Sequence, residues 1–182
     1  MPKKKKRHAH GHDTKHVQMR RNYCFGCGLD NPDGMHLKFS YDEERDAVIG
    51  RIRLARRYWG PPKHAHGGII ATVLDEAMGK VNRKHQVVAL TSEMKVEYLK
   101  PVPLGKPLLV EARERTVRGR RHVNVAEIRD ERGEVLARGH AVFIAIDPHR
   151  MFAKYLPASE RRDLFLPPAK LPAARPKRLP KR

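Results

Sequence analysis

The segment YWGPPKHAHGGIIATVLDEAMG, residues 58–79, decides the fold. A turn-rich loop over residues 60–66 leads into a Gly-Gly pair, where an apolar helix is predicted to begin and to run to about Asn82. Its apolar residues recur at the three- and four-residue spacing of a buried helical face. The first amides of such a helix have no intrahelical acceptor, so they can polarise a carbonyl oxygen or hold an oxyanion.

Two adjacent acids on this helix differ in position. Asp75 falls in a row of small residues beside the apolar stripe, where a ligand can approach the helix closely. Glu76 lies on another face, one turn before Lys80, and an ordinary i, i+4 ion pair explains it. Because burying a carboxylate costs free energy, we expect Asp75 to be the chemical acid and Glu76 a solvated partner of Lys80. The alternative is that both acids are only surface charges.

Runs of alternating apolar and polar residues predict six strands. Two precede the helix, at residues 35–41 and 47–54, and four follow it, at 87–99, 107–117, 122–129 and 134–146. Because short turns join the last four, we expect them to form an antiparallel meander. The fold class is therefore α+β, with a curved antiparallel sheet of about six strands wrapped around one long central helix.

The remaining sequence suggests tails around one domain. Most of the formal net charge of +19 lies in residues 1–21, which also contain a His-x-His-x-His run, and in residues 167–182. Both segments lack apolar periodicity, so we expect disordered basic tails that bind polyanions weakly. The domain itself spans residues 22–150, and residues 151–182 form an extension with a short helix at 158–164.

Composition indicates the cellular setting of the protein. Two cysteines are too few for a disulfide framework, and no apolar run approaches the roughly 20 residues that span a bilayer. The basic N-terminus is not followed by the apolar stretch of a secretory signal. We therefore expect a soluble, cytoplasmic protein without a transmembrane segment.

Both cysteines stand in the motif Cys24-Phe-Gly-Cys27-Gly. Cys-x-x-Cys is half of a zinc site, but the sequence holds no second pair, so histidines such as His36 or a partner chain would have to complete it. The alternative, which we favour, is a compact turn whose small residues pack under the domain. No metal is assigned from sequence.

The pattern His66-Gly67-Gly68-x6-Asp75, followed by Glu-Ala-Met-Gly, resembles the hotdog-fold acyl-CoA thioesterases of the PaaI-like group. The Gly-Pro-Pro lead-in and the upstream Cys-x-x-Cys-Gly-x-x-Asn-Pro-x-Gly stretch are similar as well. The resemblance covers residues 22–147. It implies a hotdog fold and hydrolysis of an acyl-CoA to a free acid and CoA without a cofactor, and it leaves the acyl group open.

The resemblance also implies roles for single residues. Gly67 would direct its N–H at the thioester carbonyl, Asp75 would act as nucleophile or as general base on water, and His66 would shape the loop. Thr91 would orient the lytic water, with Ser92 as the alternative because the strand alignment is uncertain by one residue.

Two further residues belong to the implied substrate site. Gly68 completes the glycine pair. His64 is the nearest candidate to contact the thioester where relatives often have Asn or Gln, and whether it replaces them stays open. Basic residues of the domain, among them Lys100, Arg118, Arg120 and Arg121, could meet the CoA phosphates.

Partners follow from the same resemblance. Sites of this family lie at a dimer interface, with the glycine and the acid from different protomers, so we expect a homodimer or a dimer of dimers and an inactive monomer. One alternative is a non-catalytic hotdog domain that binds acyl-thioester ligands, with basic tails contacting nucleic acid or anionic membrane. A hydratase-type hotdog is less consistent with an acid on the helix after His-Gly-Gly.

Overall fold

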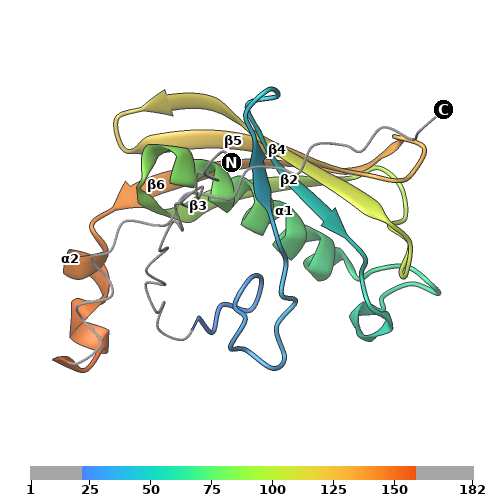
Figure 1. The fold of residues 1–182 in the computed structure, drawn as a ribbon, viewed down its shortest axis with the longest axis horizontal. Helices are drawn as coiled ribbons and strands as arrows, with labels where there is room; N and C mark the ends of the chain where they lie inside the picture. Colours follow the sequence, from blue (N-terminus) through green and yellow to red (C-terminus); the bar gives the residue numbers. More distant parts are fainter. Residues whose placement is uncertain (1–21, 159–182) are drawn as a thin grey trace, which may run out of the picture.

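The computed structural model describes residues 22–158, in which an antiparallel sheet curves around one long helix (Figure 1). The strands are β1 (Ser40–Asp42), β2 (Ala47–Ile52), β3 (Val88–Tyr98), β4 (Leu108–Arg118), β5 (Arg121–Arg129) and β6 (Val135–Ile146). The helices are α1 (Gly67–Val81) and α2 (Pro148–Phe152), with short 3-10 turns at Arg56–Tyr58, Asn82–His85 and Ala153–Tyr155. The predicted α+β architecture of about six strands around a central helix is confirmed.

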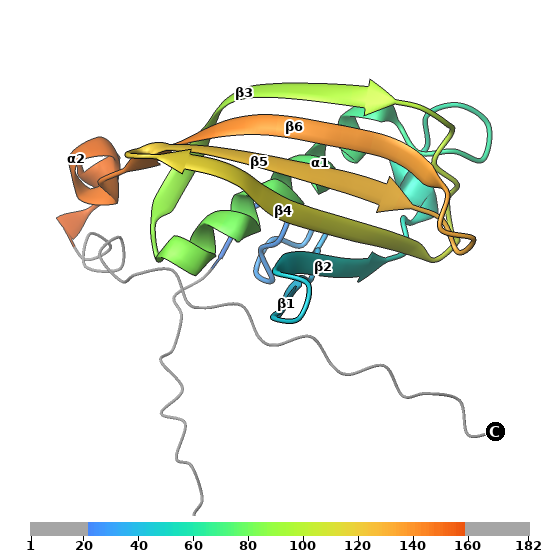
Figure 2. The same ribbon diagram turned by 90° about the horizontal axis from the view of Figure 1, so that it is seen from above.

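The order of the strands is β1-β2-β4-β5-β6-β3. Figure 2 shows β3 at one edge of the sheet and β1 at the other. The predicted meander is correct for β4, β5 and β6 but wrong for β3, which pairs with β6 instead of β4. The reason is that α1 lies between β2 and β3 in the chain and crosses the sheet, so that β3 begins at the far edge and β4 returns to pair with β2.

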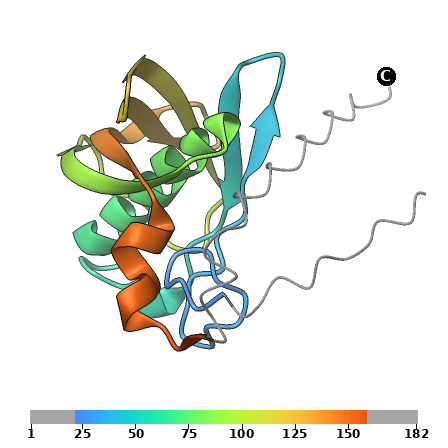
Figure 3. The same ribbon diagram turned by 90° about the vertical axis from the view of Figure 1, so that its left-hand side faces the viewer.

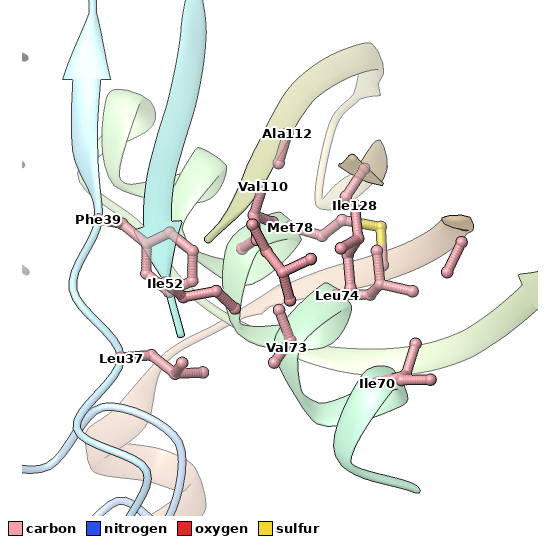
Figure 4. Packing of buried hydrophobic residues seen from close by; sticks show 14 of the residues in the cluster. Leu37, Phe39, Ile52, Ile70, Val73, Leu74, Met78, Val110, Ala112 and Ile128 are labelled. Atoms are coloured by element: carbon pink, nitrogen blue, oxygen red, sulfur yellow. The ribbon is translucent and has the colours of Figure 1, made fainter. Parts of the chain in front are cut away.

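Helix α1 lies within the curve of the sheet (Figure 3) because its apolar stripe is buried there. The stripe comprises Ile70, Val73, Leu74, Ala77, Met78 and Val81, all of them buried as the sequence predicts. Figure 4 shows Val73, Leu74 and Met78 of this stripe beside Val110 and Ile128 of the sheet. Burial of each large aliphatic side chain contributes about 1.5–3 kcal/mol, so the packing fixes both the position and the rotation of the helix.

The first predicted strand is mostly a docked loop, since of residues 35–41 only Ser40 and Tyr41 belong to β1, which ends at Asp42. The N–H groups of Met35 and Leu37 donate instead to the carbonyls of Phe25 and Gly26, at 2.8 and 2.9 Å. The loop over residues 22–37, which we call the N-terminal loop, therefore satisfies its own backbone polar groups and needs no strand partner.

The C-terminal part of the domain also departs from prediction. Helix α2 was not expected, although Asp147 caps it by accepting from the N–H groups of His149 and Arg150. The predicted helix at residues 158–164 lies, apart from its first residue, outside the described residues, as do both basic tails. None of the helices between residues 22 and 158 is long and apolar enough to cross a lipid bilayer.

Strand β3 has an irregularity that matters for the site. Its register with β6 shifts between Thr91 and Glu93, so Ser92 is an extra residue in a β-bulge. Ala89 and Val96 both pack against the core although seven residues separate them. An odd separation would place them on opposite faces of an unbroken strand, so the bulge is what keeps both on the helix side.

Candidate active site

Asp75, in the middle of α1, faces β3. Thr91 Oγ1 donates a hydrogen bond of 2.6 Å to Asp75 Oδ1. Of the two hydroxyls considered from sequence, the structure thus brings Thr91 to the acid, whereas Ser92 lies exposed in the bulge. The acid and hydroxyl come from different elements, and the bulge sets which hydroxyl faces the helix.

The environment of Asp75 favours its protonated form. Burial raises the pKa of this half-buried carboxyl, the Thr91 hydrogen bond opposes that effect, and the nearby negative charge of Glu76 adds to it. The net direction is upward from the ordinary value for aspartate. A carboxylate with a raised pKa is a stronger base toward water than an exposed one.

The start of α1 is organised by His66, the N-cap residue. Its Nδ1 accepts a hydrogen bond of 3.0 Å from the Gly68 N–H, and its own N–H donates to the Tyr58 carbonyl at 2.9 Å. The Gly68 amide is therefore engaged by the cap. Among residues 22–158, the Gly67 N–H has no hydrogen-bond acceptor, so Gly67 is the amide that can donate outward.

Tyr98, at the end of β3, lies against this amide and was missed from sequence. Its hydroxyl donates to the Gly67 carbonyl at 3.2 Å, and its ring would lie 3.6–3.7 Å from a Cβ placed on Gly67. The side chain is 55% exposed although it lies on the helix side of the strand. The sequence offered an aromatic residue at the strand end as the only signal, and its inward direction depends on the bulge.

His64 is held within the loop that precedes α1. Its Nδ1 lies 2.8 Å from the Pro62 carbonyl oxygen, and its backbone forms a bridge to Pro103. The described contacts bring His64 to neither Gly67 nor Asp75. Its contact with a thioester stays a prediction.

The two main chemical groups of the site lie far apart within one chain. Eight residues separate Gly67 from Asp75 along α1. At a rise of 1.5 Å per residue, the two positions are about 12 Å apart along the helix axis. The Gly67 amide and the Asp75 carboxylate of one protomer therefore cannot act on the same carbonyl group.

Glu76 differs from the sequence-based expectation. Its ion pair with Lys80 is present at 3.2 Å, but the two side chains are only 16% and 12% exposed, so the prediction of a solvated pair is wrong. The N-terminal loop covers them, with Cys24 Sγ 3.0 Å from Glu76 Oε1 and Lys80 Nζ 2.8 Å from Cys27 Sγ. Periodicity along α1 could not show this cover because the loop comes from a distant part of the chain.

Two groups of side chains in residues 22–158 have the atoms and spacing to hold a metal ion. Cys24, Cys27 and Glu76 form the first group and His85, Glu114 and His122 the second, with the candidate ligand atoms of each within 4.8 Å of one another. In the second group Glu114 already pairs with His85 and lies 4.0 Å from Lys84. His36, considered from sequence as a ligand beside the cysteines, instead lies 2.6 Å from the Asn31 carbonyl oxygen.

Of the basic residues considered for CoA phosphates, Arg118, Arg120 and Arg121 lie at the turn between β4 and β5, and Lys100 follows β3. Lys100 pairs with Glu134, and Arg120 donates to the Ala145 carbonyl at 2.8 Å. Arg120 also lines a hollow of about 610 Å³ beside α2, together with Arg150. The structure brings neither Lys100 nor Arg120 into contact with Asp75.

Comparisons with known proteins found similarity to thioesterases. Residues 62–137, which include the glycine pair, Asp75, Thr91 and Tyr98, match the family described as Thioesterase superfamily. Acyl-coenzyme A thioesterase THEM4 of Xenopus laevis is 30% identical over 135 residues, covering 72% of this chain and 60% of the relative. The chain thus spans about 60% of the length of the curated relatives that it matches.

Solved structures show the same fold. A thioesterase superfamily protein is 28% identical with a TM-score of 0.59, covering 63% of this chain and 56% of that one. A hypothetical thioesterase from Streptococcus pneumoniae TIGR4, solved with coenzyme A, is 17% identical with a TM-score of 0.55, covering 60% and 84%. Residues 62–137 match the thioesterase superfamily, and the domain has the hotdog fold, as the motif around the glycine pair predicts.

Proposed function

We propose that this protein is an acyl-CoA thioesterase that hydrolyses an acyl-CoA thioester to a free acid and CoA. The observation that carries the proposal is the half-buried Asp75, which accepts the 2.6 Å hydrogen bond of Thr91. Two comparisons support it, since the Xenopus laevis relative is named as an acyl-CoA thioesterase and the Streptococcus pneumoniae structure contains coenzyme A.

The groups of the site suffice for thioester hydrolysis. The Gly67 N–H, at the positive end of the α1 dipole, polarises the carbonyl and stabilises the oxyanion that forms. Asp75 takes a proton from water while the hydroxyl adds to the carbonyl carbon, or its carboxylate adds directly and the mixed anhydride is then hydrolysed. Collapse of the oxyanion breaks the C–S bond, and the CoA thiolate leaves and takes up a proton.

Thr91 positions the carboxylate in either route. Its hydroxyl binds Asp75 Oδ1, which leaves Oδ2 without a hydrogen bond to any residue in the range 22–158. That free oxygen can point to water or to the carbonyl carbon. We therefore propose that Thr91 orients Asp75 and the water beside it.

The proposal requires two protomers, because the amide and the acid of one chain lie about 12 Å apart along the helix. Strand β3 is an edge strand and carries exposed Leu90, Met94 and Tyr98. An unpaired edge with apolar side chains is suited to pair with a second copy about a two-fold axis. We infer that such a dimer brings Gly67 of one protomer to Asp75 of the other.

A screen of the purified protein with short, long and aromatic acyl-CoAs, read by a thiol-trapping reagent, tests the proposal. Asp75→Asn keeps the shape of the side chain and removes its basicity, so hydrolysis should fall about 10²-fold or more. Asp33→Asn, in the exposed N-terminal loop, is the matched control and should keep the wild-type rate. Circular dichroism and gel filtration should show folded protein of unchanged size for both variants.

Two results would contradict the proposal. One is the absence of Asp75-dependent hydrolysis for every acyl-CoA tested. The other is acyl-CoA binding without turnover, which would support a non-catalytic domain that binds acyl-thioester ligands.

Removal of residues 1–21 and 167–182 is expected to leave hydrolysis intact while reducing retention on DNA.

A further inference from the structure

The N-terminal loop and α1 bring two thiols, a carboxylate and an ammonium group together. Cys24 Sγ donates to Glu76 Oε1 at 3.0 Å, and Lys80 Nζ lies 2.8 Å from Cys27 Sγ and 3.2 Å from Glu76 Oε2. Both sulfur atoms and a carboxylate oxygen lie within 4.8 Å of one another. None of these four side chains takes part in the hydrolysis proposed above.

The glycines of the motif explain how the loop approaches so closely. A Cβ on Gly26 would lie 2.3 Å from Glu76 Cγ, so only glycine lets the backbone pass over this carboxylate. A Cβ on Gly28 would lie 2.2 Å from the Asn22 carbonyl oxygen, and the Gly28 N–H donates to the Cys24 carbonyl at 2.8 Å. Both glycines thus serve one tight turn that presents two sulfur atoms to Glu76.

We propose that Cys24, Cys27 and Glu76 form a binding site for a thiophilic divalent cation, with Zn²⁺ as the best match. Two cysteines separated by two residues are the commonest half of a structural zinc site, and a carboxylate oxygen is an accepted third ligand. Soft thiolates select zinc over magnesium or calcium, which prefer oxygen ligands only. A water molecule completes the tetrahedron.

Charge balance favours this assignment. With both thiols protonated, Glu76 and Lys80 cancel each other. When a divalent cation replaces one proton from each thiol, the sum of charges stays at zero and Lys80 keeps its hydrogen bond to the Cys27 sulfur. A partly buried site tolerates a neutral assembly far better than a net charge. Lys80 is therefore compatible with the cation as a hydrogen-bond donor to its thiolate ligand.

The bound cation would fasten the N-terminal loop to the middle of α1. Because a cysteine binds zinc as its thiolate, the cation must displace the thiol protons and its affinity should rise with pH. Because Cys24 and Cys27 lie on the loop and Glu76 on the helix, cation binding should slow amide hydrogen exchange in residues 22–37. This effect does not depend on the enzymatic activity.

Titration of the reduced, metal-stripped full chain with Co²⁺ and Zn²⁺ tests the site. We expect one Co²⁺ per chain with a thiolate-to-cobalt charge-transfer band, displaced by Zn²⁺ measured against a chromophoric chelator. Cys24→Ser and Cys27→Ser should abolish the band. Glu76→Gln should weaken Zn²⁺ binding at least tenfold, whereas Glu111→Gln, on β4, should not change it.

The His-rich segment of residues 1–21 needs its own control, because histidines can bind Co²⁺ without producing a thiolate band. Replacement of His8, His10 and His12 by Gln should leave the band unchanged. The proposal is overturned if the reduced wild-type chain gives no such band or if Cys27→Ser retains it. It is equally overturned if mass spectrometry finds Cys24 and Cys27 joined in a disulfide that persists under the reducing conditions that keep other thiols free.

Discussion

At the residue scale, the hydrogen bond between Thr91 and Asp75 links the chemistry to the sheet. Thr91→Val keeps the shape and loses the hydroxyl, so kcat should fall about tenfold, because a hydrogen bond to a charged group contributes about 1.5–3 kcal/mol. Thr91→Ser should restore most of the rate. Thr116→Val, on exposed β4, is the control, and steady-state kinetics with the best acyl-CoA of the screen provide the measurement. An unchanged kcat for Thr91→Val would mean that Asp75 needs no positioning.

His122 predicts a pH dependence of stability. It is only 3% exposed, and burial together with the nearby His85 lowers its pKa, which Glu114 opposes. The folded chain therefore keeps His122 neutral at a pH where the unfolded chain, with an ordinary pKa of about 6.5, takes up a proton. The free energy of unfolding should fall as pH drops below that value toward the lower folded pKa.

Urea unfolding at a series of pH values measures this dependence. His122→Gln should flatten the decline between neutral pH and pH about 5, whereas His140→Gln, on the exposed side of β6, should leave it unchanged. A decline of the same slope in His122→Gln would show that His122 does not cause the effect.

Single residues also show where sequence reasoning reached its limit. Counting alternate positions forward from Ala89 selects Thr91 as the inward hydroxyl, whereas counting back from Val96 selects Ser92. The uncertainty of one residue has a physical cause, because the bulge at Ser92 interrupts the alternation of side chains. Each count is correct only for its own half of the strand. The position of Asp75 could be predicted from helix periodicity alone. The burial of Glu76 could not, because it depends on the docking of the N-terminal loop, which no local pattern encodes.

At the element scale, the first turn of α1 allows a sharp test of the oxyanion donor. Proline is tolerated at the first position of a helix, and the extended backbone of His66 is what a residue before proline requires. Gly67→Pro should therefore keep the fold and remove only the N–H, lowering kcat about 10²-fold. Gly67→Ala keeps the N–H and meets only ordinary contacts with Tyr98, so it should stay within a few-fold of wild type. Equal loss in both variants would point to crowding instead.

The elements themselves were largely predictable, and their order was not. The stripe of α1 and the alternation of β2, β4, β5 and β6 are strong local signals, and the structure contains each of them within a few residues. The place of β3 at the far edge depends on how the helix crosses the sheet, which is a property of packing and not of any window of sequence. For the same reason residues 35–39, which alternate like a strand, became a loop once Phe25 and Gly26 supplied their hydrogen bonds.

At the scale of the whole molecule, the proposed dimer makes a prediction about mixtures. Asp75→Asn and Gly67→Pro homodimers should both be nearly inactive. After the two are unfolded together and refolded, half of the dimers are mixed and each has one site with both native groups, so roughly a quarter of the wild-type rate should return. Analytical ultracentrifugation should show the dimer for each protein. Absence of recovery in verified mixed dimers would mean that the amide and the acid do not act across the interface.

The fold class could be anticipated from the segment around the glycine pair and the strand-like runs beside it, whereas the order of the strands could not. The proposed dimer could not be anticipated from the residues alone, because the exposed side chains of β3 are seen to lie at an edge of the sheet only when the strand order is known. The basic tails lie outside the described residues, so neither conclusion applies to them.

The bulge at Ser92 has a consequence for how this sequence can change in length. Loss of another residue from the middle of β3, with the bulge kept at Ser92, would turn one half of the strand over and place Val96 or Thr91 on the wrong face. Loss of Ser92 alone would leave every other side chain on its present face and merely straighten the strand beside Thr91. We therefore expect a variant that lacks Ser92 to keep the fold, with any change in catalysis arising from the altered bend beside Thr91.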